Sequence, residues 1–84
     1  MDFGKALKAL KQGKRVRRKF WEELGHYLYL VPLNSYPAVT EHAKKEFGVL
    51  VPYEPYLAIK INASVIPWSP NHQDLIFDDW EILD

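Results

Sequence analysis

The chain contains 84 residues, with 11 basic and 11 acidic side chains and no cysteine, which predicts one small domain without a disulfide framework or a thiolate metal site. Its net charge of +0 argues against duplex DNA or RNA as a partner, because a neutral chain lacks the field that attracts a polyanion. The lack of a long apolar run or a secretory leader predicts a cytoplasmic protein with no membrane segment, and the wide spacing of the histidines predicts no metal centre.

The first segment predicts a short amphipathic helix over residues 3–10. Apolar side chains recur at helical spacing on one face, and lysines lie on the other. Asp2 can cap the start of this helix, and Gly13 can supply a left-handed stop. A helix this short is marginal by itself, so we expect it to pack on the body of the domain.

Residues 14–21 predict a strand with one unusual position. Period-2 alternation places Val16, Arg18 and Phe20 on one face. Trp21 falls on the opposite face, among the other basic residues. Arg18 is therefore expected on an apolar, partly buried face, where a guanidinium needs a carboxylate, phosphate or carbonyl partner.

The middle of the chain predicts a covered strand and a long connection. Residues 26–32 are apolar on both faces of an extended chain, which is typical of a central strand or of one covered by another subunit. The connection over 33–55 contains prolines and aromatic rings, and long structured connections are often functional. Within it, residues 40–47 predict a short helix that Thr40 caps and Gly48 ends.

The C-terminal third predicts a hairpin, a helix and a last strand. Its strands are expected over 56–61, 65–68 and 79–83. The hairpin turn at 62–64 lacks the glycine that such turns usually contain, which leaves its geometry open. Ser69 and Pro70 match the N-cap and the first position of a helix that runs to about Phe77.

These elements predict a small single domain of the α+β class, in which an antiparallel sheet carries an N-terminal helix and one or two short helices. The apolar share of 48% is more than a domain of this size readily buries. We therefore expect part of the apolar surface to lie at subunit contacts.

Tryptophans are candidate stacking surfaces for an aromatic base, a contact worth about 1–3 kcal/mol. Packing in the core or at its rim is the commoner role of tryptophan in a small domain. We predict that Trp80 is mainly structural and that Trp68 faces a ligand. Trp21 serves either as a further stacking wall or as a cation–π partner of Arg17 or Lys19.

Arg18 and three aspartates are the other candidate site residues. Arg18 either pairs with Asp74, Asp78 or Asp79 or holds a phosphate through two parallel hydrogen bonds. Asp74 can also accept hydrogen bonds from a ribose or an adenine amine. Catalysis has little support in the sequence, because no nucleophile is paired with a base, no glycine-rich phosphate loop occurs, and adjacent aspartates on a strand point to opposite faces.

Four stretches carry a family resemblance that covers nearly the whole chain. They are MDFGKALKALKQGKRVRRKFW, YLYLVPLNSYPAVTEHAKKEFG, VPYEPYLAIK and PWSPNHQDLIFDDWEI. Their motifs are an aromatic helix followed by glycine and Val-x-Arg, a Trp-x-x-x-x-x-Asp segment and a terminal Asp-Trp. In these features the chain resembles the phage and prophage Thoeris anti-defence family of the second type, a short domain formerly of unknown function.

The resemblance implies a single signal-sequestering domain over residues 1–84 that acts as a non-enzymatic sponge in the bacterial host cytoplasm. The expected ligands are cyclic ADP-ribose isomers made by TIR-domain defence proteins and, in some relatives, cyclic dinucleotides at a second site. The resemblance also implies a homotetramer with pockets where subunits meet, and no cofactor. Such a protein evades anti-phage defence by holding the signal without cleaving it.

Carried over residue by residue, the resemblance implies ligand contacts at Trp21, Trp68 and Asp74, with Arg18 and Ser69 beside them. It implies no catalytic or metal-binding residue. Two rival functions stay open at this point. One is a small hydrolase that uses Asp74 or Asp78 as base on a cyclic nucleotide, and the other is a structural or partner-binding phage protein.

Overall fold

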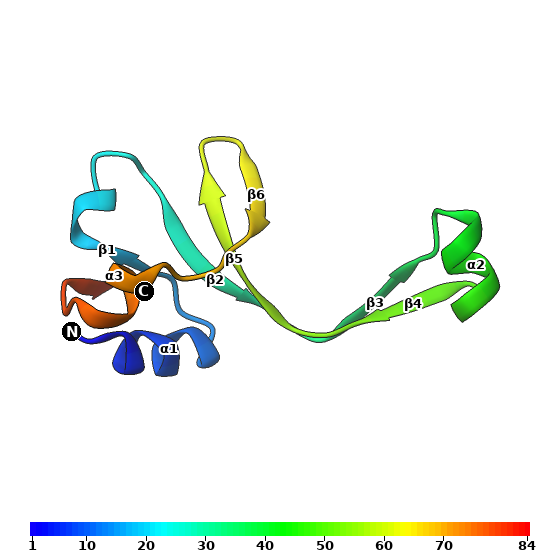
Figure 1. Cartoon of the computed structure of the whole chain (residues 1–84), viewed down its shortest axis with the longest axis horizontal. Coiled ribbons are helices and arrows are strands. Elements are labelled where there is room, and N and C mark those ends of the chain that lie inside the picture. The colour runs from blue at the N-terminus through cyan, green and yellow to red at the C-terminus, as the bar shows by residue number, and fades with distance from the viewer.

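In the computed structural model, which describes residues 1–84, a head of helices and sheet carries one long arm (Figure 1). The helices are α1 (Phe3–Lys11), the 3-10 helix η1 (Lys19–Trp21), α2 (Glu41–Phe47) and α3 (His72–Ile76). The strands are β1 (Val16–Arg18), β2 (Tyr27–Val31), β3 (Asn34–Pro37), β4 (Leu50–Tyr53), β5 (Tyr56–Ile61), β6 (Ser64–Pro67) and β7 (Trp80–Ile82). The radius of gyration is 15.4 Å, against about 12 Å for a compact domain of this length, because the arm extends away from the head.

The head is built on a five-stranded antiparallel sheet. Its strand order is β6-β5-β2-β1-β7. The strand predicted to be central does lie in the middle, where β2 pairs with β5 on one side and with β1 on the other. Together with the helices, this sheet confirms the predicted small α+β domain.

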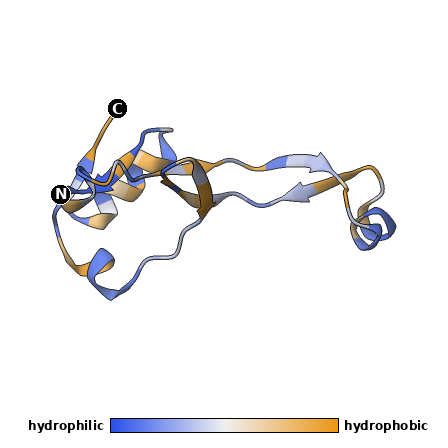
Figure 2. Cartoon of the chain, turned by 90° about the horizontal axis from the view of Figure 1, so that it is seen from above, coloured by the Kyte–Doolittle hydropathy of each residue, from blue (hydrophilic) through white to orange (hydrophobic).

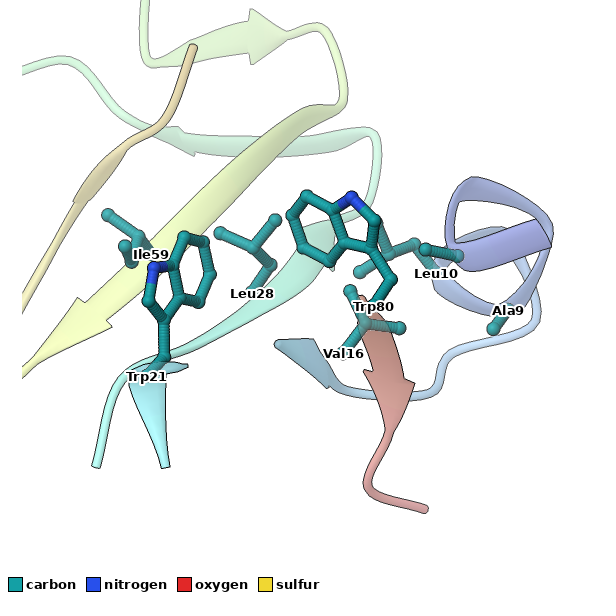
Figure 3. Close-up of a cluster of buried hydrophobic side chains, with 8 residues drawn as sticks. Ala9, Leu10, Val16, Trp21, Leu28, Ile59 and Trp80 are labelled. Atoms are coloured by element: carbon teal, nitrogen blue, oxygen red, sulfur yellow. The ribbon is translucent and has the colours of Figure 1, made fainter. Parts of the chain in front are cut away.

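Helix α1 packs on the sheet and closes the core. The Asp2 carboxylate accepts a hydrogen bond of 2.8 Å from the Lys5 backbone N–H, and Gly13 has φ 86°, so both predicted ends are confirmed. The core cluster, most of which is seen in Figure 3, consists of Ala6, Ala9, Leu10, Val16, Trp21, Leu28, Ile59 and Trp80. Burial of each large apolar side chain stabilises the fold by about 1.5–3 kcal/mol, so the short helix is held in place by these contacts.

The predicted strand over 14–21 is wrong in its second half. Strand β1 ends at Arg18, and the chain then forms η1. A 3-10 helix has three residues per turn, so the period-2 alternation stops there. Phe20 is consequently 59% exposed and Trp21 only 6% exposed, which reverses their predicted faces. Arg18 keeps its predicted place on the apolar face beside Val16.

The segment predicted as a long connection forms the arm, which is a two-stranded ribbon that ends in a helix. Strands β3 and β4 pair antiparallel, and each contains a proline, which removes a ladder donor and disguises a strand in the sequence. The predicted helix is confirmed as α2, because the Thr40 hydroxyl accepts a hydrogen bond of 3.1 Å from the Ala43 N–H and Gly48 has φ 81°. Figure 2 shows a hydrophilic α2 between apolar stretches of the arm.

The C-terminal hairpin has the predicted strands, with a turn that needs no glycine. Asn62 adopts φ 54°, a left-handed conformation that asparagine tolerates better than most side chains. The last strand, β7, pairs with β1 so that Arg18 lies opposite Trp80. This pairing brings residues from opposite ends of the chain to one corner of the head.

The predicted start of the third helix is wrong by two residues. Asn71, rather than Ser69, caps α3: its side chain accepts from the Asp74 N–H, and the Asp74 carboxylate accepts from the Asn71 N–H, both at 2.9 Å. This reciprocal capping box fixes the helix start after residue 71. None of the helices has the length and apolar character needed to cross a membrane.

The capping box yields a direct test. Asn71→Ala is expected to lower the free energy of unfolding by about 1 kcal/mol, because it leaves a helix N–H without its acceptor. Ser69→Ala is the matched control and should leave stability unchanged within error. Both values can be measured by urea unfolding followed through tryptophan fluorescence. A larger loss for Ser69→Ala than for Asn71→Ala would contradict this assignment of the cap.

Candidate functional site

Arg18 is a buried cation held by two carboxylates. Its Nη1 donates to Asp74 Oδ1 at 2.8 Å, its Nε donates to Asp79 Oδ1 at 2.5 Å, and its Nη2 donates to Asp79 Oδ2 at 3.2 Å. The hydrogen bonds that Arg18 donates to Asp79 and, with a smaller effect, to Asp74 raise the pKa of Arg18 against the opposing effect of burial. The guanidinium also lies 4.9 Å from the Phe20 ring centroid and 5.1 Å from that of Phe77. The structure shows carboxylate pairing, which is one of the two alternatives predicted for Arg18.

Asp74 joins three elements of the head. One carboxylate oxygen accepts from Arg18 on β1 and the other from the Asn71 N–H at the start of α3. Its backbone carbonyl accepts from Trp80 Nε1 at 2.9 Å. At the third position of α3, the negative charge also lies where the helix dipole favours it.

The tryptophans form one aromatic cluster with Phe3. The ring centroids of Trp21 and Trp80 are 5.5 Å apart, those of Trp68 and Trp80 are 6.0 Å apart, and those of Trp21 and Trp68 are 6.4 Å apart, all edge to face. Trp80 is 2% exposed, which agrees with its predicted structural role. Trp68 is half-buried at the margin of the cluster. Trp21 packs on other indoles rather than on Arg17 or Lys19.

The two other arginines form ion pairs nearer the surface. Arg15 binds the Asp84 carboxylate through Nε at 2.8 Å and Nη2 at 2.7 Å. Hydrogen bonding to Arg15 lowers the pKa of Asp84. Arg17 lies 3.3 Å from Glu81. These pairs contribute little to stability because water screens them.

The five predicted site residues thus converge on one corner of the head. The corner is formed by β1, η1, α3 and the segment that precedes α3. Trp21, Arg18 and Asp74 are buried, Trp68 is half-buried and Ser69 is exposed. Within one chain Arg18 pairs with Asp74, and Trp21 packs on Trp68. None of the five residues lines the pocket of the chain. No group of three or more His, Asp or Glu side chains is placed to hold a metal ion.

The pocket of this chain lies elsewhere, on the arm. It has a volume of about 450 Å³ and is lined by Tyr36, Pro37, Val39, Tyr53 and Tyr56. Sequence reasoning noted the aromatic rings and prolines of this stretch but did not place them together. The pairing of β3 with β4 brings them together, since it sets Tyr36 and Tyr53 with ring centroids 5.5 Å apart.

Fold and geometry together define a small α+β domain with an ion-paired head and an aromatic arm. The Thoeris anti-defense 2-like domain family matches residues 1–83. Thoeris anti-defense 2 of Bacillus phage SP01 is 31% identical to this chain over an alignment of 88 residues. The alignment covers 99% of this chain and 94% of that protein. The chain therefore belongs to the Thoeris anti-defense 2-like family, as the resemblance predicted. This membership assigns it an anti-defence role.

Proposed function

We propose that this protein sequesters a cyclic nucleotide immune signal in the host cytoplasm and releases it unaltered. The ligands are cyclic ADP-ribose isomers made by TIR-domain defence proteins and, at a second site, cyclic dinucleotides. The observation that carries the proposal is the match to an anti-defence family named for Thoeris over essentially the whole chain.

The ion pairs of the head favour binding over hydrolysis. A general base must have a free oxygen within reach of the proton that it abstracts. Both carboxylate oxygens of Asp74 accept hydrogen bonds, and both oxygens of Asp79 face Arg18. Neither carboxylate adjoins a serine or another nucleophile among the hydrogen bonds of the chain. Asp74 and Asp79 therefore stabilise the corner of the head. Asp78, the other candidate base, accepts a hydrogen bond at its backbone oxygen from the N-terminal amine, and no hydrogen bond joins its carboxylate to a nucleophile.

The candidate contacts suit a planar ligand at the surface of that corner. Trp68 supplies a partly open indole and Ser69 an exposed hydroxyl, while Trp21 packs edge to face on Trp68, and Arg18 and Asp74 are buried at the same corner. A sponge must hold its signal at roughly nanomolar concentration, which corresponds to about −12 kcal/mol. Such affinity requires an enclosed site. We therefore propose that the site is completed between subunits of a homotetramer.

The decisive experiment separates sequestration from hydrolysis. The protein is incubated with a cyclic ADP-ribose isomer and filtered to retain bound ligand. It is then denatured by heat, and the released nucleotide is analysed by mass spectrometry. Quantitative recovery of the cyclic form is the expected result. A linear product would show the hydrolase instead, and no retained ligand with either the isomers or cyclic dinucleotides would favour a purely structural protein.

A further inference from the structure

The arm exposes apolar surface that one chain cannot cover. Its exposed large apolar residues are Leu33, Tyr36, Val39, Phe47, Val49, Leu50 and Tyr53. Val51 is the buried residue of β4 and lies outside the core cluster of the head. A two-stranded ribbon alone is at best marginally stable in water, and apolar patches of this kind mark interaction surfaces. The arm therefore requires a partner.

The pocket on the arm has the chemistry of a proline-binding groove. Three of its five lining residues are tyrosines, and none is charged. Tyr36 and Tyr53 meet at an interplanar angle of 63°, and all three tyrosines are more than 40% exposed, so aromatic surface is available to a guest. Extended proline-rich segments dock in aromatic-lined grooves of this kind, because little chain entropy is lost when they bind.

The chain contains a segment that fits such a groove. Pro67-Trp68-Ser69-Pro70 has the P-x-x-P spacing and carries no charge. Pro67 is the last residue of β6, opposite Ala58, and residues 68–70 follow it without regular structure. Pro67, Ser69 and Pro70 are exposed. The other P-x-x-P run, Pro52 to Pro55, contains the charged Glu54 and includes Tyr53 of the pocket itself, so it suits this groove less well as a guest. Matching uncharged surfaces allow the groove and the 67–70 segment to meet without burying an unpaired charge.

We infer that the tyrosine pocket on the arm of one copy receives the Pro67–Pro70 segment of a second copy. The contact covers the exposed arm and places its tyrosines beside Trp68 and Ser69 of the other chain. The docking itself does not require a nucleotide. Its consequence, that the arm forms the missing wall of the ligand site at Trp68, rests on the proposed function.

The test uses the lack of cysteine in the chain, so that each introduced thiol is unique. Tyr53→Cys and Ser69→Cys chains, carrying tags of different mass, are co-expressed, purified as the mixed assembly and mildly oxidised. A disulfide forms only where the two Cα atoms come within about 4–7 Å. We expect a disulfide-linked heterodimer in this mixture, because residue 69 lies between the two docked prolines.

The matched control replaces Ser69→Cys by Lys8→Cys, on the exposed face of α1, and should give no heterodimer. Tyr36→Cys serves as a second arm variant in case Tyr53→Cys disturbs the ribbon. An assembly that persists without any arm-to-segment disulfide would overturn the inference, and so would a purely monomeric protein. The cross-linking is measured without ligand, so a negative result would not contradict the proposed binding of a nucleotide. Equally, a negative nucleotide-binding assay would not contradict the proposed docking.

Discussion

Arg18→Ala is expected to destabilise the domain by about 3–5 kcal/mol, because it leaves the buried Asp74 carboxylate without its cation. Arg18 is 3% and Asp74 4% exposed, so water cannot replace the lost hydrogen bonds. The total stability of a domain of this length is about 4–12 kcal/mol. The loss is therefore a large part of the whole, and part of the variant population should be unfolded at 37 °C.

Urea or thermal unfolding of the variant measures this loss, and Arg15→Ala is the matched control. Arg15 makes an equally well-formed pair with Asp84, yet the two side chains are 42% and 61% exposed, so its removal should change stability far less. The double variant Arg18→Met, Asp74→Leu should recover much of the loss, since a buried ion pair can be replaced by apolar side chains of similar volume. Equal effects of Arg18→Ala and Arg15→Ala would refute the role given to burial.

Local signals were sufficient to predict several helix starts and strands in the head and the arm. Asp2 and Thr40 cap their helices as predicted, because a side-chain acceptor followed by a helical pattern specifies a start within a few residues. The strand over 56–61 is also confirmed, since its alternation and flanking turn residues are local properties. Each of these features depends on contacts between residues close in sequence.

The prediction errors occur where a distant or a reciprocal contact determines the local structure. Phe20 and Trp21 exchange faces because the pairing of β1 with β7 ends at Arg18 and a 3-10 helix follows. The start of α3 depends on mutual hydrogen bonds between Asn71 and Asp74, which compete with the Ser69-Pro70 signal. The ribbon of the arm needs pairing across the whole of α2, and its prolines hide that pattern.

The candidate site could be predicted in part. The sequence indicated that Arg18 needs an anionic partner, but the choice of Asp74 and Asp79 depends on residues 56 and 61 positions away. Only the strand order brings these side chains together. The tyrosine pocket was not predictable for the same reason, since Tyr36 and Tyr53 meet only through the ribbon.

Trp68→Ala is expected to weaken binding of a cyclic ADP-ribose isomer by about 5- to 150-fold, which corresponds to the loss of about 1–3 kcal/mol of base stacking. Trp68 is half-buried at the margin of the aromatic cluster, so the fold should tolerate the change. Trp80→Ala is the contrasting variant. It empties a core site and should cost about 3–5 kcal/mol of stability, because Trp80 is 2% exposed and its Nε1 donates to Asp74.

Calorimetry with the cyclic nucleotide and sedimentation velocity separate these two roles. Trp68→Ala should keep the assembly state of the parent protein while losing affinity, and Trp68→Phe, which retains a ring, should recover part of the binding. Trp80→Ala should lose folding and binding together. If Trp68→Ala instead dissociates the assembly, or binds as tightly as the parent, then the indole packs against protein alone and the nucleotide must stack elsewhere.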